Sequence, residues 1–531
     1  FLAEPDDTSF PRDSVSAATE DSNTPVPNDA LRLAPSTGNR DVSASRRLEY
    51  TAFALILALA AALRLTGVNW DNGSQLHPDE RFLFMVEGAI RPGLVIPGSN
   101  GAGDSTREAP IWQYYFDSAR SGLNPHNVGY GFFVYGTFPL FAAKIVIAWL
   151  QSLGIDRIHV VGRTLSALSD IGSVWLTVAI SRRLFGTRIA LLSAVFMATC
   201  VLHIQQAHFF VFDSFLVTLV LATFWYCLDI VAFSRWTDFA KVGVLLGLTL
   251  ATKLSMVLFL PVIALAGMTH LVASNSRTPG CNESEQKLRA VTTGIANIDQ
   301  VIARIITAWD DGRFATVVAG GLLVGLVAIA TFRVAQPYAF AGPTVLDLRL
   351  NGRWLDNIDY QAKSQSGEVD LPPSIQWANT TPVLFPIRHM VVWGLGIPLG
   401  VAGLVGVVGA SWMAVTRGHW QLGLVAFWAA LCLLYFSSVL NKTMRYLLPA
   451  YPFVMILGAW AVVGFVDFAR RLREANSSQR SLSMNDAIAD LSAESEAWQP
   501  SSVGWSEYPP HLAVAKLYEE ALRSLIVAVE L

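Results

Sequence analysis

Long apolar runs separated by polar stretches dominate the hydropathy pattern of this chain. A run of about 20 apolar residues can cross a bilayer as a helix, because a helix satisfies its own backbone polar groups. The pattern predicts an all-α polytopic membrane protein with roughly ten to twelve transmembrane helices, since several runs are short for a full crossing. The eleven runs are residues 50–66, 131–150, 162–181, 188–204, 209–232, 240–253, 254–272, 314–334, 389–412, 420–440 and 446–468.

Polar stretches set the predicted domain organisation. The N-terminal tail is rich in Pro, Ser, Asp and Asn, so it is too polar to build a core and is predicted to be disordered. The transmembrane domain is interrupted by two long loops and one polar loop, and a polar C-terminal region with helical patches follows it. In that order, the segments are the tail 1–47, the transmembrane domain 48–468 with its long loops 67–130 and 335–388 and its polar loop 273–313, and the C-terminal region 469–531.

Lysine and arginine in short loops predict the orientation, because they favour the cytoplasmic side. Basic residues precede the first run, follow the last run and occupy the turns near 182–188, 235–241 and 417. Placing them inside makes loops 67–130 and 335–388 extracytoplasmic, and 273–313 and 469–531 cytoplasmic. One conflict remains. Two runs lie between loop 67–130 and the turn at 182–188, where an odd number is needed, so either one run does not cross or that turn faces out.

Composition excludes the other broad classes. The 531 residues are 53% hydrophobic with a mean hydropathy of +0.42, and only 15% are charged, whereas soluble domains carry about 25% charged residues. The net charge of −3 argues against a nucleic-acid partner. The four cysteines lack metal-ligand spacing and are interpreted as small buried hydrophobic residues: Cys200, Cys227, Cys281 and Cys432. The chain starts at Phe1 and stops within a helical pattern, which is consistent with a fragment.

Adjacent carboxylates follow the first run, in the segment Gln75–Phe82. A carboxylate beside a membrane can take a proton from an acceptor hydroxyl as a general base. Two neighbouring carboxylates repel, so we expect either a raised pKa on one or a cation holding both. The alternative is a solvated acidic turn that caps a helix starting near Arg81.

A second group of ionisable residues begins at His203 and ends at Asp213. His208 is five residues from each of them, so these side chains do not share one helical face. Ionisable residues at a membrane boundary are functional candidates, and Asp213, at the start of a run, is the most suggestive. The alternative is that they bind lipid headgroups or loop backbone.

Two cations occupy predicted turns on the same side as the carboxylates. Lys253 separates two apolar runs, and Arg445 precedes the last run. Either could bind a phosphate, although a flanking cation that reaches to the interface is the commoner case. Carboxylates, cations and histidines at one membrane face suit a lipid-linked phosphate, whose tail stays in the bilayer while its headgroup meets protein charges.

The segment Leu76–Phe82 resembles the acidic first-loop motif of GT-C-type membrane glycosyltransferases, in the protein O-mannosyltransferase and aminoarabinose-transferase-like group. Further matches follow in the family's order over about residues 48–468. They are Asn124-Pro125-His126, Tyr130-Gly131, Tyr135-Gly136, Phe138-Pro139-Leu140, Arg163–Leu168, Arg182–Gly186, His208 with Asp213, Ala251-Thr252-Lys253, Gln336-Pro337-Tyr338 and Arg445–Pro452.

This resemblance implies an inverting transfer of a sugar from a polyprenyl-phosphate donor at the extracytoplasmic face of a prokaryotic plasma membrane. The acceptor would be a lipid, a glycan or a protein. It further implies that Asp79 is the general base and that Glu80 orients Asp79 or the acceptor. The expected substrate-binding residues are His77, Arg81, His208, Asp213, Lys253, Gln336, Tyr338, Arg445 and Tyr446.

Two departures limit what the resemblance implies. The loop 335–388 is short and no soluble lumenal domain is recognisable, which argues against a protein acceptor of the O-mannosyl type. A divalent cation is compatible with the chemistry, but no ligand spacing argues for one. The rival functions are a secondary transporter, which would show repeated halves and a midplane site, and a non-catalytic protein that binds lipid-linked sugars.

Overall fold

The computed structural model describes residues 38–96, 106–273, 296–369 and 372–477. The predicted tail up to residue 37, the centre of the polar loop with Cys281, and the C-terminal region from residue 478 lie outside the described residues. The chain separates into two units, 1–50 and 51–531. Everything below concerns the second unit.

Among the described residues, eight helices are long and apolar enough to cross a membrane, which confirms an all-α polytopic membrane protein. Two further apolar helices, α4 (Thr137–Ser152) and α8 (Trp236–Leu250), are shorter. The eight are α1 (Gly38–Leu65), α5 (Ile158–Thr199), α7 (Asp213–Phe233), η2–α9 (Leu254–Phe259 and Leu260–Ala273), α12 (Arg313–Ala335), α15 (Ile397–Arg417), α16 (Trp420–Ser438) and η7–α17 (Met444–Ala450 and Tyr451–Ser477).

Helix α5 is two antiparallel arms rather than one rod. Gly186 interrupts it with φ 80° and ψ 178°, a left-handed backbone conformation that glycine adopts without strain. Val178 and Ala194, each eight residues from Gly186, pack in one cluster with Phe53 of α1. The bend therefore separates the two predicted runs 162–181 and 188–204 as expected.

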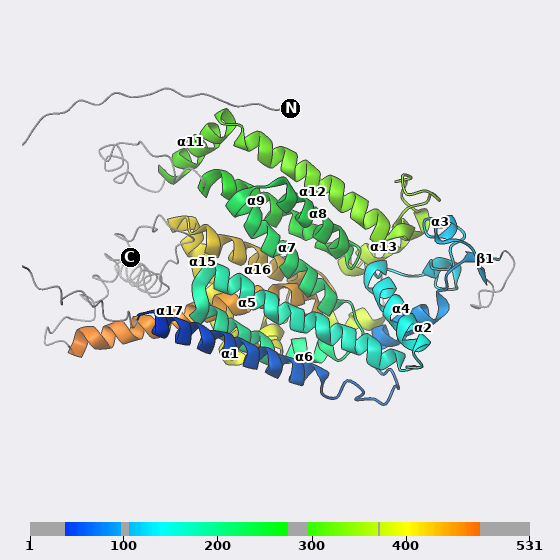
Figure 1. The fold of residues 1–531 in the computed structure, drawn as a ribbon, viewed down its shortest axis with the longest axis horizontal. Coiled ribbons are helices and arrows are strands. Elements are labelled where there is room, and N and C mark those ends of the chain that lie inside the picture. The colour runs from blue at the N-terminus through cyan, green and yellow to red at the C-terminus, as the bar shows by residue number, and fades with distance from the viewer. Residues whose placement is uncertain (1–37, 97–105, 274–295, 370–371, 478–531) are drawn as a thin grey trace, which may run out of the picture. The chain divides into compact units, whose positions relative to one another are not determined.

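Helix α4 resolves the conflict in the predicted topology. Its N-terminus adjoins the turn before Lys253, because the Gly136 N–H donates to the Thr252 carbonyl. Its apolar face, including Leu140 and Ile147, packs in one cluster with α2 (Pro78–Ala89). The α5 helix that follows begins at the same end of the bundle, where Figure 1 shows α4 beside α2. Both ends of α4 thus lie at one end of the bundle, and α4 is the predicted run that does not cross.

The two long loops meet at this same end, which we call the loop face. The Tyr115 hydroxyl donates to the Val334 carbonyl at 2.8 Å, and the hydroxyls of Ser121 and Tyr338 are 2.7 Å apart. Which side of the membrane the loop face occupies stays a prediction. The remaining elements are β1 (Leu94–Val95) paired with β2 (Thr106–Arg107), α3 (Ile111–Tyr114), η1 (Pro125–Asn127), α6 (Val201–Ala207), α11 (Ala296–Asp310), η4 (Pro337–Ala339), α13 (Gly352–Ser366), η5 (Pro372–Trp377), α14 (Leu384–His389) and η6 (Met390–Gly394).

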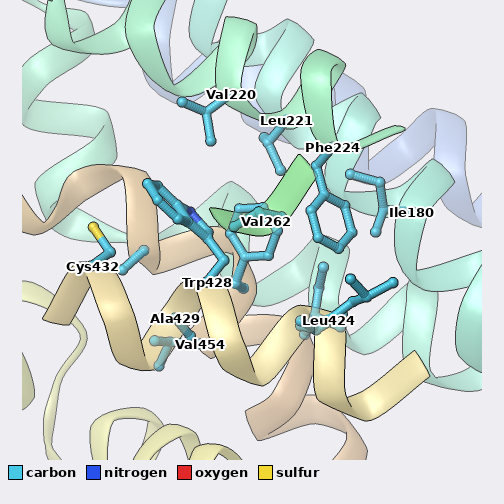
Figure 2. Close-up of a cluster of buried hydrophobic side chains, with 14 of the residues drawn as sticks. Ile180, Val220, Leu221, Phe224, Val262, Leu424, Trp428, Ala429, Cys432 and Val454 are labelled. Atoms are coloured by element: carbon cyan, nitrogen blue, oxygen red, sulfur yellow. The ribbon is translucent and has the colours of Figure 1, made fainter. Parts of the chain in front are cut away.

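The core of the bundle is apolar and aromatic. Trp428 of α16 lies among side chains from α5, α7, α9 and α17 (Figure 2), and its indole N–H donates to the Pro449 carbonyl at 3.0 Å. This bond satisfies the polar group of an otherwise apolar side chain. The described cysteines Cys200, Cys227 and Cys432 are buried free thiols, as predicted.

Small residues bring α15 and α17 close together. A Cβ on Gly406 would lie 2.3 Å from the Leu457 carbonyl oxygen. Helices in membranes commonly pack through such glycines, because apolar attraction alone does not distinguish a neighbouring helix from lipid.

Candidate active site

The N-terminus of α2 presents the two predicted carboxylates. His77 is the N-cap, and its Nδ1 accepts from the Glu80 N–H, while Pro78 occupies the first turn. A capping acceptor and an early proline both favour a helix start. Successive residues on a helix point about 100° apart, so Asp79 and Glu80 face different surroundings.

Glu80 is fully buried and faces α5. Its carboxylate accepts from Arg163 at 2.6 and 2.8 Å and from the Phe210 N–H at 2.8 Å. Arg163 also binds Asp71, and this hydrogen bonding holds the pKa of Asp71 well below its usual range. Through these bonds to Arg163 and Phe210, Glu80 stabilises the packing of α2 against the bundle. This differs from the expectation that Glu80 orients Asp79 or the acceptor.

Asp79 faces a cluster of charges at the loop face. It forms an ion pair with Arg445, whose side chain is 26% exposed, whereas that of Asp79 is 23% exposed. Burial and the nearby carboxylate of Asp79 raise the pKa of the Tyr135 hydroxyl above its ordinary value. Tyr135 therefore stays protonated beside the carboxylate. The sequence motifs include Tyr135-Gly136 but assign Tyr135 no role.

Lys253 and Arg445 both lie near the ring of Tyr446. The Lys253 Nζ is 4.5 Å from the centroid of the Tyr446 ring, and the Arg445 guanidinium carbon is 5.8 Å from it. Lys253 pairs with Asp213 at 3.2 Å. The carboxylates of Asp213 and Asp79 both lie close enough to Arg445 to attract its charge. Two carboxylates and two cations, from four distant segments, thus form one cluster.

Three long helices begin at this cluster. Asp213 is the first residue of α7, Lys253 precedes the helix Leu254–Val272, and Arg445 is in the first turn of the helix Met444–Arg471. A helix N-terminus carries a partial positive charge that favours anions and disfavours cations. Lys253 and Arg445 therefore lie where a cation does not stabilise the helix, and the arrangement suits an anionic ligand.

The other predicted substrate-binding residues have protein partners elsewhere. Both ring nitrogens of His208 lie within 2.8 Å of the Ile204 and Thr66 carbonyl oxygens. Arg81 donates to the Gln75 carbonyl. The Gln336 side chain accepts from the hydroxyl of Thr137 at 2.6 Å, and the buried Tyr338 bonds Ser121. These four residues stabilise the loops and helix ends. His77, in contrast, lies close enough to Asp79, Arg445 and Asp213 for their charges to act on its imidazole.

An apolar cavity of about 590 Å³ opens beside the cluster, between α4, α8 and α12. It includes Leu248, which is five residues before Lys253, and Phe138, whose N–H donates to the Ala251 carbonyl. Neither Lys253 nor Arg445 lines this cavity. In the described ranges, no three His, Cys, Asp or Glu side chains gather closely enough to hold a metal ion.

Several solved structures resemble the chain at low identity. They include the oligosaccharyltransferase AglB from Archaeoglobus fulgidus in complex with an inhibitory peptide and a dolichol-phosphate, with 11% identity, a TM-score of 0.45, and coverage of 89% of this chain and 56% of that one. They also include ArnT from Cupriavidus metallidurans bound to undecaprenyl phosphate, with 14% identity, a TM-score of 0.39, and coverage of 79% and 68%. The chain spans little more than half the length of the archaeal enzyme.

A search of curated protein sequences found no match. A family model described as dolichyl-phosphate-mannose-protein mannosyltransferase matches residues 142–298. The matched region runs from α4 to the polar loop and includes Arg163, Asp213 and Lys253, although Asp79 and Arg445 lie outside it. Over residues 142–298 the family match confirms the resemblance to GT-C-type membrane glycosyltransferases that the sequence motifs predict.

Proposed function

We propose that the protein is a membrane glycosyltransferase that transfers a sugar from a polyprenyl-phosphate donor to a hydroxyl acceptor, with inversion at the anomeric carbon. The observation that carries this proposal is the ion pair of Asp79 with Arg445 beside Lys253. A carboxylate able to act as a base and two cations able to bind a phosphate are within one cluster, although they are far apart in the sequence.

At the anomeric carbon one bond forms and one breaks, and a proton moves from the acceptor to Asp79. The acceptor oxygen bonds to the anomeric carbon as the bond from that carbon to the phosphate oxygen breaks. The acceptor proton passes to the Asp79 carboxylate, and the electron pair of the broken bond leaves on the phosphate. Arg445 and Lys253 stabilise that charge, so the leaving group needs no proton.

The charges of the cluster imply an order of events. Asp79 and Asp213 balance Arg445 and Lys253, so the four side chains have no net charge. A donor phosphate that binds Arg445 takes the place of Asp79 and frees that carboxylate to accept a proton. The protonated hydroxyl of Tyr135, which lies near Asp79, can then donate a hydrogen bond to the freed carboxylate. Binding of the donor thereby activates the base.

The apolar cavity fits the other half of the donor. Its walls are almost entirely apolar, and Phe138 connects it to the turn that precedes Lys253. A polyprenyl tail in this cavity would enter from the bilayer, while its phosphate would reach the helix N-termini at Lys253 and Arg445.

The test is to incubate purified protein in lipid nanodiscs with a polyprenyl-phosphate mannose that is radiolabelled in the sugar, together with short-chain glycolipid acceptors. We expect a labelled glycolipid and one equivalent of polyprenyl phosphate. Binding of the donor without release of polyprenyl phosphate would indicate a non-catalytic binding protein. Uptake of the label into sealed vesicles without release of polyprenyl phosphate would indicate a transporter. Either of these two results would refute the proposal.

A further inference from the structure

A second set of buried charges lies within the bundle, away from Asp79. Arg64, at the end of α1, donates from Nε to Asp170 of α5 at 2.6 Å. Its terminal nitrogens donate to the carbonyls of Ala198 and Met197 at 2.8 and 2.9 Å. Both charged side chains are fully buried. Because buried charges are costly unless they are paired and hydrogen-bonded, this pair fixes α1 against both arms of α5.

His203 extends this network to α6. Its Nδ1 lies 2.7 Å from the second carboxylate oxygen of Asp170, and its side chain is fully buried. The carboxylate only accepts hydrogen bonds, so Nδ1 carries the proton. A further proton on Nε2 would leave a second buried positive charge beside Arg64, opposed by the single charge of Asp170. Nε2 is therefore an acceptor, and it has no partner among the described side chains and backbone.

Tyr451 offers the complementary group. It is the first residue of α17, is fully buried, and its hydroxyl is also without a partner among the described atoms. Its ring centroid lies 5.9 Å from that of His203. The hydroxyl also lies against Gly394, because a Cβ on Gly394 would lie 2.0 Å from it. Two neighbouring rings thus carry an acceptor without a donor and a donor without an acceptor, and an unsatisfied buried polar group is costly.

We propose that the Tyr451 hydroxyl donates to His203 Nε2 in the working protein, and that the chain Arg64–Asp170–His203–Tyr451 positions the two halves of the active site. From His203, helix α6 leads to Phe210, which binds Glu80, and then to Asp213. From Tyr451, six residues lead back through η7 to Arg445. The hydrogen bond connects these two segments. Tyr451 and His203 are positioning residues, and this second role rests on the proposed function.

The hydrogen bond can be tested without any transfer reaction. The spectrum of ¹⁵N-histidine-labelled protein in nanodiscs should contain a neutral imidazole protonated at Nδ1, and this signal should be missing in His203→Gln. Tyr451→Phe removes only the hydroxyl, so the Nε2 resonance of His203 should move toward the position of a nitrogen without a hydrogen bond. An unmoved resonance, or an imidazole protonated at Nε2, would overturn the proposed bond.

A double-mutant cycle tests the same bond by steric means. Gly394→Ala should displace the hydroxyl and shift the same resonance. In Gly394→Ala/Tyr451→Phe the clash with the hydroxyl is removed and only the contact with ring carbon Cζ at 3.0 Å remains, so the double variant should lie closer to Tyr451→Phe alone than to the sum of the two changes. Additive effects would mean that Gly394 and the hydroxyl act independently, which contradicts the geometry.

The positioning role is tested by measuring kcat, corrected for the fraction of each variant that is folded. Small displacements of reacting groups cost up to about 100-fold in rate, so Tyr451→Phe should lower kcat by about tenfold or more. Thr223→Val is the matched control, because it removes a buried hydroxyl of α7 that bonds only its own helix. Equal kcat values for Tyr451→Phe and this control would refute positioning. If wild-type protein transfers no sugar, the proposed function fails while the resonance test still decides the bond.

Discussion

Replacing Asp79 by asparagine should abolish sugar transfer and leave the fold intact. Asparagine keeps the size of the side chain and an oxygen that can accept a hydrogen bond, but it takes no proton at neutral pH. Arg445 loses its ion-pair partner but keeps the charge of Asp213 nearby. The substitution therefore separates the proposed proton transfer from the packing of the site.

The magnitudes of the two effects differ widely. Loss of a general base typically costs about 10²–10⁴ in rate, which is about 3–5 kcal/mol of barrier. The ion pair of Asp79 with Arg445 is about one quarter exposed, so its contribution to stability is screened and is about 1 kcal/mol or less. The variant should melt close to wild type, with kcat lower by two to four orders of magnitude.

The assay measures release of polyprenyl phosphate at saturating donor and, separately, binding of polyprenyl phosphate to each protein. If the donor phosphate displaces Asp79 from Arg445, the asparagine variant should bind it as tightly as wild type or more tightly. Wild-type activity in this variant would refute the role of Asp79 and leave Asp213 as the next candidate base. A large loss of thermal stability would instead show that Asp79 is mainly structural.

Three other substitutions test the surroundings of Asp79. Lys253→Met should raise the donor KM about tenfold, because it removes one charge-assisted contact of about 1.5–3 kcal/mol, and an unchanged KM would mean that Lys253 only reaches to the interface. Glu80→Gln should lower the free energy of unfolding by about 3 kcal/mol, because it weakens a fully buried ion pair with Arg163. The variant should nevertheless keep substantial activity per folded molecule. A catalytic defect without destabilisation would contradict this structural role of Glu80. Burial lowers the pKa of His77, so the unfolded chain binds a proton first and stability should fall as the pH drops below about 6.5. His77→Asn retains a helix-capping side chain, and calorimetry from pH 7.5 to 5.5 should show a weaker pH dependence than in wild type.

The sequence predicts the transmembrane helices well, because lipid requires long apolar segments whatever their neighbours are. It leaves open whether α4 crosses, because apolar residues of α4 such as Leu140 and Ile147 pack against α2, while Ile145 and Trp149 are exposed. Lys144, near the middle of that run, pairs with Glu87 of α2, but the sequence alone does not show that this partner exists. A partly apolar helix and a short transmembrane helix have the same composition and differ only in what they contact.

For the candidate site, too, the sequence could predict some features and not others. Lys253 and Arg445 could be predicted to share a face, since both precede a run at the same end of the bundle. The separate roles of Asp79 and Glu80 could not be predicted, because these neighbours differ only in direction and the direction depends on where α5 lies. Tyr135 was missed for the same reason, since the motif that contains it does not reveal its hydroxyl's partner.

The three helices that begin at the cluster have a consequence for inhibitor design and for natural variation. Part of the attraction that a helix start exerts on an anion comes from backbone N–H groups, which no side-chain substitution removes. Resistance to a compound that occupies this anion site should therefore be hard to acquire by exchanging Lys253 alone. Changes that tilt or shorten a helix start would be needed, and under the proposed function those changes would also disturb binding of the donor phosphate. A tetrahedral anion with a short branched hydrocarbon is thus the most durable starting scaffold.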